Sequence, residues 1–143
     1  LVRFVLKNSA EPLKVEHLKR VIFTTIPQRD KNKVKVVFSQ NLPVIIHPSG
    51  LDVNMEPWKD LQWHMRGGKL SVENKTPYVI RLEQKVKLLP SGAHADLPKA
   101  YILPGETISA YASTTLSALD KNVEMYPATR YGYKAKSFVA EIK

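Results

Sequence analysis

The sequence has 143 residues, of which 43% are hydrophobic, and this favours one ordinary globular domain or two small ones. It contains no cysteine, which excludes disulfides, cysteine nucleophiles and thiolate metal sites. The formal net charge of +9 suits acidic partners, but the lysines are spread thinly, so a basic solvated surface is the simpler interpretation. No apolar run approaches the roughly 20 residues of a membrane-spanning helix, and the opening Leu-Val-Arg-Phe-Val is not a secretory signal.

Short β-rich runs recur along the chain, separated by Pro, Gly, Asn and Asp. The expected strands are 2–6, 18–25, 33–46, 61–65, 69–73, 78–88, 100–103, 107–112, 122–126 and 135–142. Gly67-Gly68 predicts a tight hairpin between two of them, and Leu103-Pro104-Gly105-Glu106 predicts another turn. No segment shows a convincing helical stripe. Many short strands with frequent turns are typical of an all-β sandwich or barrel.

The chain divides near His47-Pro48-Ser49-Gly50, where a long apolar strand ends and a polar, turn-rich stretch begins. Residues 48–143 hold seven expected strands, enough for a complete immunoglobulin-like β-sandwich. Residues 1–47 hold three, which alone would bury little surface. We therefore expect a partial first domain over 1–47 and a complete second domain over 48–143. The partial domain would lean on the second domain, on another chain or on residues missing from the sequence.

The stretch from Val34 to Pro48 is unusual because both of its faces carry apolar residues. Val34, Val36 and Phe38 share one parity, and Val37 lies on the other. A strand of this kind has apolar partners on two sides, or it awaits a second partner. The alternative is an ordinary central strand of a sandwich.

The residues make no case for an enzyme. The four histidines are scattered without the spacing of metal ligands, and a loop or surface role is expected for each: His17, His47, His64 and His94. There is no carboxylate pair placed for acid–base chemistry, no Gly-rich phosphate loop and no nucleophile elbow. Asn74-Lys75-Thr76 matches an N-glycosylation acceptor only weakly, because Pro77 follows at once. We expect no catalytic residue, no metal and no cofactor.

One stretch closely resembles a known family. It is LQWHMRGGKLSVENKTPYVI, residues 61–80, and it is similar to the opening of the second domain of PapD-like periplasmic pilus (fimbrial) chaperones of the chaperone–usher pathway. That family carries a Trp-containing strand, a Gly-Gly hairpin and a strand that ends in Asn-x-Thr/Ser-Pro-Tyr. The matching positions are Trp63, Gly67, Gly68, Asn74, Thr76, Pro77 and Tyr78. The turn YILPGE at 101–106 also fits the family's second domain.

A second stretch, EHLKRVIFTTIPQ at 16–28, resembles the signature of the family's first domain. Glu16, Ile26 and Pro27 fit it, whereas Ile22 stands at a usual asparagine and Arg20 at a usual aromatic residue. In order, the resemblance covers the whole chain. It implies that the first domain keeps only its last three strands and lacks its N-terminal part. The short loop at 27–32 is similar to that of the short-loop subfamily.

The resemblance implies a non-enzymatic periplasmic chaperone that binds and stabilises pilus subunits by donor-strand complementation and delivers them to an outer-membrane usher. The donor strand would be 33–46, with Val37 facing the chaperone's own core. The side chains entering the subunit's groove would be Val34, Val36, Phe38, Gln40 and Leu42. Pro43 falls where the family has a lysine that helps to anchor the subunit's C-terminal carboxylate, so the anchor is unassigned.

The expected partners are therefore pilus subunits and the usher, with no nucleic acid and no membrane insertion. Self-association through the donor strand is a further expectation, because an uncovered strand can pair with another copy. The alternative function is a basic β-sandwich adhesion or polyanion-binding module. It would bind heparin or DNA in a way that weakens steeply with salt.

Overall fold

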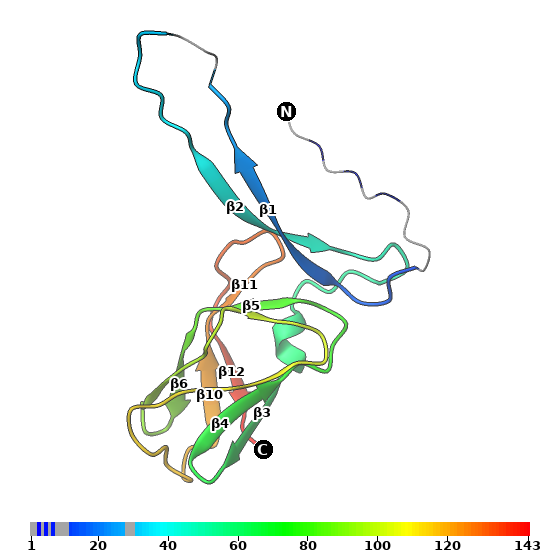
Figure 1. Cartoon of the computed structure of the whole chain (residues 1–143). Helices are drawn as coiled ribbons and strands as arrows, with labels where there is room; N and C mark the ends of the chain where they lie inside the picture. Colours follow the sequence, from blue (N-terminus) through cyan, green and yellow to red (C-terminus); the bar gives the residue numbers. More distant parts are fainter. Residues whose placement is uncertain (1–2, 4, 6, 8–11, 28–30) are drawn as a thin grey trace.

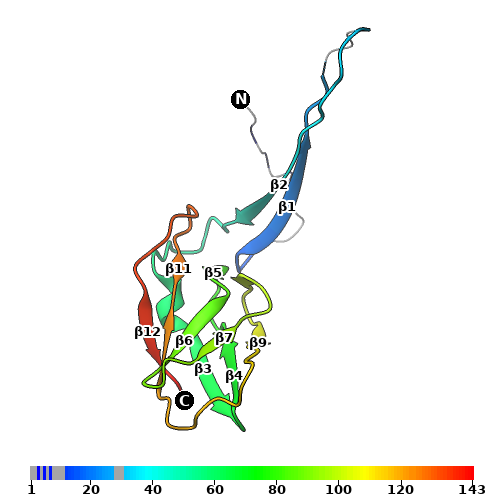
Figure 2. The same ribbon diagram turned by 90° about the vertical axis from the view of Figure 1, so that its left-hand side faces the viewer.

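The computed structural model describes residues 3, 5, 7, 12–27 and 31–143. In this part of the chain, a two-stranded hairpin projects from a β-sandwich (Figure 1, Figure 2). The hairpin pairs β1 (His17–Thr24) with β2 (Ser39–Ile46) in antiparallel register, with His17 opposite Ile46 and Thr24 opposite Ser39. The expected strand at 2–6 lies outside the described residues, apart from Arg3 and Val5, which are not in a strand.

The second hairpin strand is shorter than its sequence predicts. A strand was expected from residue 33, but β2 begins at Ser39, and residues 33–38, here called the distal segment, form no ladder. Beyond the ladder, the N–H of Thr25 donates to the carbonyl of Phe38 at 3.0 Å. The N–H of Phe38 in turn donates to the Thr25 hydroxyl at 3.2 Å. The apolar side chains of the distal segment are exposed, so no packing holds it in a ladder.

The sandwich contains the remaining strands of the chain. They are β3 (Gln62–Arg66), β4 (Lys69–Glu73), β5 (Ile80–Leu82), β6 (Lys85–Leu89), β7 (His94–Asp96), β8 (Tyr101–Ile102), β9 (Thr107–Ser109), β10 (Asn122–Met125), β11 (Pro127–Ala128) and β12 (Phe138–Glu141). Their sheets run β12-β10-β6-β7, β11-β5-β8 and β3-β4-β9, and the ladders between these strands are antiparallel. Trp63 of β3 also forms a parallel bridge with Ile142. The 3-10 helix η1 (Pro57–Asp60) precedes β3. Among the described residues, no helix has the length and apolar character needed to cross a membrane. The expected all-β fold is confirmed.

One expected strand divides between two sheets. The run at 78–88 forms β5 and then β6, with a break at Glu83 and Gln84. The N–H of Glu83 donates to the carbonyl of Tyr126, whereas the carbonyl of Gln84 accepts from the N–H of Leu97. The chain therefore leaves the sheet of β5 and enters the sheet of β6 at this point. β7 was missed altogether, because His94-Ala95-Asp96 has no β-branched or aromatic residue.

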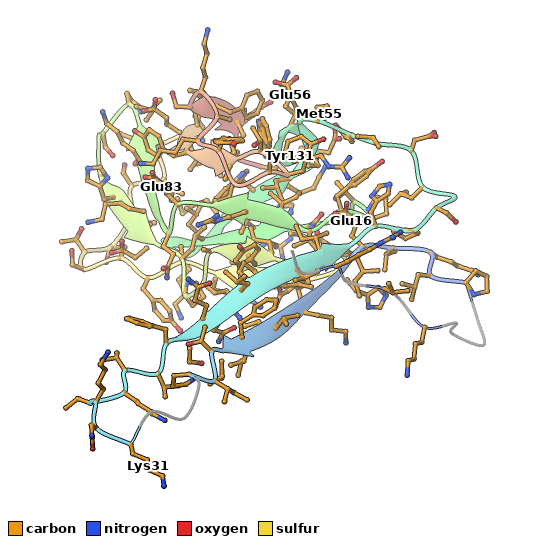
Figure 3. All side chains as sticks on the ribbon, turned by 90° about the horizontal axis from the view of Figure 1, so that it is seen from above. Glu16, Lys31, Met55, Glu56, Glu83 and Tyr131 are labelled. Carbon is orange, nitrogen blue, oxygen red and sulfur yellow. The ribbon has the colours of Figure 1, made fainter. Side chains whose placement is uncertain are left out.

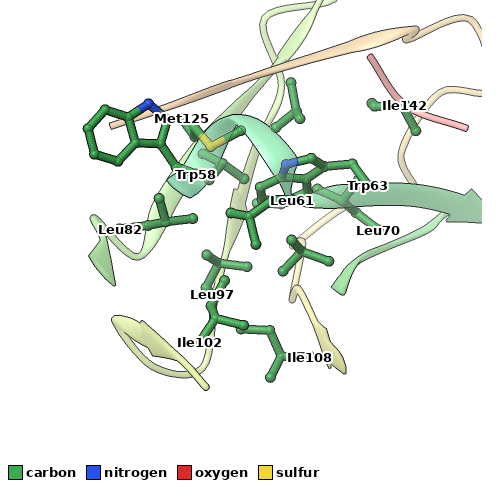
Figure 4. Packing of buried hydrophobic residues seen from close by; sticks show 14 of the residues in the cluster. Trp58, Leu61, Trp63, Leu70, Leu82, Leu97, Ile102, Ile108, Met125 and Ile142 are labelled. Atoms are coloured by element: carbon green, nitrogen blue, oxygen red, sulfur yellow. The ribbon is translucent and has the colours of Figure 1, made fainter. Parts of the chain in front are cut away.

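The hydrophobic core belongs to the sandwich. Alternate residues of each strand point inward, as with Leu70 and Val72 of β4 and Val86 and Leu88 of β6. Trp63 is fully buried between the sheets, and Figure 4 shows it packed among leucine and isoleucine side chains. Burying one such aliphatic side chain contributes about 1.5–3 kcal/mol. Among the described residues, neither β1 nor β2 adds a side chain to this cluster, so the sandwich has a core of its own.

The Gly-Gly turn between β3 and β4 is confirmed. Gly67 and Gly68 have φ angles of 57° and 72°, values that favour glycine over residues with a side chain. A Cβ on Gly68 would lie 2.7 Å from Cγ2 of Thr115, whereas one on Gly67 would meet nothing within 4 Å. The two glycines therefore share the same backbone constraint but differ in packing.

We expect Gly68→Ala to lower the free energy of unfolding by about 2–4 kcal/mol, because the backbone strain and the clash with Thr115 add together. Gly67→Ala is the matched control and should cost about 1–2 kcal/mol, from backbone strain alone. Urea unfolding of both variants at one pH measures the difference. Equal losses would show that the packing against Thr115 contributes nothing.

Candidate binding site

The distal segment of the hairpin carries a run of exposed apolar side chains. Val34 is 96% exposed and Phe38 67% exposed, and Val36 is also exposed. On the facing arm, Ile22 and Ile26 are exposed as well. Soluble monomers rarely leave a large apolar patch uncovered unless it binds something. The hairpin is therefore the candidate binding surface of this chain.

Both faces of the paired part of the hairpin carry apolar residues among polar ones. Residues directly opposed in an antiparallel ladder share a face, and the register places Leu42 opposite Val21 and Ile45 opposite Leu18. One face thus carries Val21, Phe23, Leu42, Val44 and Ile46, and the other carries Leu18, Ile22, Pro43 and Ile45. The sequence predicted a strand with apolar residues on both parities, and the ladder has this character.

The structure separates the predicted donor-strand residues into two groups. Gln40 and Leu42 lie in β2 on one face of the ladder. Val34, Val36 and Phe38 lie in the distal segment, outside the ladder. Val37 was expected to face the protein's own core, and this is wrong for the described residues, because its side chain is 56% exposed. No strand of the first domain covers it in the part that the structure describes. The binding roles of these residues stay predictions.

The hairpin also offers backbone edges. Its sheet has two strands, so in the part of the chain that the structure describes each strand pairs along one edge only. A strand with an open edge is a template on which another chain can add a strand. The exposed apolar side chains beside the edge of β2 would then contact the added chain. This surface can perform strand pairing without any catalytic group.

Beneath the hairpin, Glu16 connects it to the sandwich (Figure 3). Its side chain is buried, and its N–H donates to the carbonyl of Pro77 at 2.8 Å. One carboxylate oxygen, Oε2, accepts the N–H of Val79 at 2.8 Å. The other, Oε1, lies 2.9 Å from Nδ1 of His47, whose Nε2 lies 2.8 Å from the carbonyl oxygen of Leu51. We call these contacts the joint. His47 therefore has more than the loop or surface role expected for it.

The sandwich side of the joint is held by Asn74, which is fully buried. Its Nδ2 donates to the carbonyls of Tyr78 and Ile102, at 2.8 and 3.0 Å. Its Oδ1 accepts from the N–H and the hydroxyl of Thr76, at 3.0 and 2.6 Å. A side chain with every polar atom bonded inside the fold does not serve as a glycosylation acceptor. The Asn-x-Thr-Pro-Tyr motif instead shapes the turn that carries Pro77, the acceptor for Glu16.

A cavity of about 420 Å³ lies between β2 and the sandwich. Pro43 and Ile45 line it from the hairpin, and Arg81 and Arg130 line it from the sandwich. Each guanidinium lies over a tyrosine ring, Arg81 at 5.6 Å from the Tyr101 centroid and Arg130 at 5.6 Å from that of Tyr131. Within the described residues, neither guanidinium has a carboxylate at ion-pair distance. Both are therefore available to an acidic group of a bound chain.

The described residues show no arrangement for metal chemistry, since no group of three or more His, Asp or Glu side chains is placed to hold an ion.

The sandwich and the projecting hairpin together define an immunoglobulin-like protein with an exposed strand-pairing surface.

Family comparisons agree with this description. The family described as "Pili assembly chaperone PapD, C-terminal domain" matches residues 56–138. The family described as "Pili and flagellar-assembly chaperone, PapD N-terminal domain" matches residues 1–52. The chain belongs to the PapD-like family of pilus assembly chaperones. This family consists of chaperones rather than enzymes, in agreement with the sequence prediction.

A curated relative is the "uncharacterized fimbrial chaperone YhcA" of Escherichia coli strain K12. It is 41% identical over 147 residues, which cover 99% of this chain and 62% of that protein. The chain thus spans somewhat less than two thirds of the length of the relative that it matches.

Solved structures share the fold at low identity. The CupB2 chaperone of Pseudomonas aeruginosa superposes with a TM-score of 0.70 at 19% identity, over 95% of this chain and 63% of that one. The complex of the Salmonella enterica SafA pilin with the SafB chaperone gives a TM-score of 0.67 at 18% identity, over 94% and 63%. The E. coli chaperone DraB gives 0.69 at 22% identity, over 96% and 64%.

Proposed function

We propose that this chain binds fimbrial (pilus) subunits by adding its hairpin strand to them, and so keeps them folded and prevents their premature association. The observation that carries the proposal is the exposed run of apolar side chains beside an open strand edge in a PapD-like chain. Val34, Val36, Phe38, Gln40 and Leu42 would fill the groove of the subunit. The backbone of the same segment would pair with the subunit's edges.

The distal segment would form a strand only when it binds. In the structure it forms no ladder, although its alternating residues are well suited to one. A subunit would supply both the second edge and the apolar surface that the segment lacks. A SafB chaperone structure that contains its SafA pilin supports this proposal by analogy of fold.

The setting of this activity follows from the family resemblance. We propose that the protein acts in the periplasm, that it delivers subunits to an outer-membrane usher, and that it belongs to the short-loop subtype. The partition into domains at residues 1–47 and 48–143 is part of the same proposal. The matched family segments at 1–52 and 56–138 support a boundary in this region.

Periplasmic co-expression with a pilin subunit from the same gene cluster tests the proposed function. We expect affinity pull-down and native mass measurement to give a stable one-to-one complex, with the subunit protected from degradation. If the pilin is degraded and the chain elutes alone, subunit binding is contradicted. Elution as a homodimer would show instead that the hairpin pairs with a second copy of the chain.

The alternative function, a polyanion-binding module, rests on the net charge of +9. It makes a different prediction in the same preparation. Retention on heparin that falls steeply between low and moderate salt would support it. Weak retention that does not depend on salt would exclude the polyanion-binding function.

A further inference from the structure

The backbone groups of β2 divide between its two sides in a definite order. In an antiparallel ladder, opposed residues alternate between pairs that exchange two backbone hydrogen bonds and pairs that exchange none. Thr25 lies opposite Phe38 in the continued register, and its N–H donates to the Phe38 carbonyl. This pair is therefore of the bonded kind, and so is every second pair after it, down to His17 with Ile46. The residues between these pairs point their backbone groups away from the other arm.

The open edge of β2 therefore presents the backbone groups of Ser39, Asn41, Pro43 and Ile45. Two contacts agree with this order. The hydroxyls of Thr24 and Ser39 lie 3.4 Å apart, and side chains approach more closely in the pairs that exchange no backbone bond. Glu16 stands in the same order just before β1, and its N–H donates to the carbonyl of Pro77 in the sandwich.

Pro43 interrupts this edge, because proline has no N–H. In the part of the chain that the structure describes, the N–H groups of Ser39 and Asn41 have no hydrogen-bond partner, so an added strand can accept from them. Proline is found in edge strands, with its N–H side toward solvent, and is avoided in central strands. A strand added along the whole edge would make β2 a central strand that contains Pro43. Pairing is therefore favourable only on the side of Pro43 that leads to the distal segment.

The exposure of β2 changes at the same point. Residues 39–43 are exposed, whereas residues 44–46 are half-buried. Pro43 and Ile45 line the cavity shared with the sandwich, so the hairpin meets the sandwich here. Leu42, the last residue of the proposed groove contacts, directly precedes Pro43. The missing donor, the change in exposure and the end of the groove contacts thus fall within two residues of one another.

We propose that Pro43 is a positioning residue that ends the strand pairing and so fixes the register of a bound fimbrial subunit. The inference rests on the proposed function. The subunit's edge strand pairs with the backbone of Ser39 and Asn41 and leaves the ladder opposite Pro43. A shift by one residue would turn every side chain to the other face, whereas a shift by two keeps each on its own face. Alternation therefore does not prevent a two-residue shift toward the sandwich, and the proline does.

Amide hydrogen exchange tests the stop in the complex of the intact chain with a pilin from the same gene cluster. In the free chain, the amides of Ser39, Asn41 and Ile45 all face an open edge. On binding, we expect the first two to exchange at least about tenfold more slowly, and that of Ile45 to stay within about twofold of its free rate. Pro43→Ala supplies the missing donor and should extend the protection to Ile45. Equal protection of Asn41 and Ile45 in the wild-type complex would overturn the proposal.

Disulfide cross-linking measures the register itself. The chain has no cysteine, so Ser39→Cys can be combined with single cysteines placed along the pairing strand of the same pilin. With Pro43 present, we expect cross-links at one position of the pilin. With Pro43→Ala, a second position two residues away should also react, because the shifted register keeps the same faces. A single position in both backgrounds would show that the proline does not set the register.

A proline placed earlier on the same edge should shorten the pairing. Asn41→Pro moves the stop by two residues and is expected to weaken pilin binding by about five- to tenfold, through the loss of one hydrogen bond. Asn41→Ala is the matched control, because it keeps the N–H, and it should bind within about twofold of the wild type. Both variants should leave the hairpin paired, since the N–H of Asn41 points away from β1.

The outcomes separate this inference from the proposed function. Unchanged affinity of Asn41→Pro for the pilin would show that the subunit does not pair with this edge, and would overturn the inference while subunit binding stands. Absence of any complex with the wild-type chain would overturn the proposed function, and the inference with it.

Discussion

Phe38→Asp is expected to weaken capture of a pilus subunit by about 100-fold or more. Burying a phenylalanine contributes about 1.5–3 kcal/mol, and a carboxylate in the same apolar groove would add a desolvation cost of several kcal/mol. Each 1.4 kcal/mol corresponds to about a tenfold change in affinity. The yield of co-purified subunit, normalised to the recovered chaperone chain, measures the loss.

The same substitution should leave folding nearly unchanged. Phe38 is 67% exposed and lies outside the ladder, and surface changes of this kind usually alter the free energy of unfolding by less than about 0.5 kcal/mol. Thermal unfolding of the isolated variant therefore separates a binding defect from a folding defect. Wild-type yields of subunit with Phe38→Asp would refute the donor-strand mechanism.

Val37→Asp is the matched control for the register. It introduces the same charge one residue away, on the parity that the proposal directs away from the groove. We expect a loss of capture much smaller than that of Phe38→Asp. If the two losses were equal, the distal segment would bind without a fixed alternation, and the side chains named as groove contacts would need reassignment.

The sandwich was predictable from local features. The period-two alternation of apolar residues predicted β4, and the observed bounds agree with that prediction. Gly67-Gly68 predicted the turn before it. These signals are local because a strand's alternation and a turn's φ angles depend on neighbouring residues. The break at Glu83 and Gln84 was not predictable, because it depends on bonds to Tyr126 and Leu97 from elsewhere in the chain.

The candidate site was only partly predictable, for the same reason. The apolar residues on both faces of the strand from Val34 onward predicted that the hairpin is a binding surface. The joint was missed, because Glu16 and His47 lie 31 residues apart in sequence and the family signature that contains Glu16 does not indicate its partner. The distal segment was expected to be a strand, yet strand propensity needs a packed neighbour to be realised. Propensity thus identified which residues can pair, while the tertiary contacts decided which do.

Asn74→Ala is expected to lower the free energy of unfolding by about 3–5 kcal/mol. The side chain makes four hydrogen bonds in a fully buried position, and its removal would leave the carbonyl of Ile102 and the donors of Thr76 without their partner. Each buried polar group left unsatisfied costs about 1–3 kcal/mol. Chemical unfolding monitored by the fluorescence of the buried tryptophans measures this loss.

Asn54→Ala provides the matched control, because the Oδ1 of Asn54 accepts a single such bond, from the N–H of Glu56 at 2.9 Å, in an exposed loop. Its loss should cost less than about 1 kcal/mol. Asn74→Ala should in addition speed amide exchange at Val79 and Glu16, because the turn that it supports carries both of their contacts with the joint. Similar stabilities for the two variants would mean that the Asn-x-Thr-Pro-Tyr turn does not depend on this side chain. Normal exchange at the joint would mean that the sandwich holds the hairpin through other contacts.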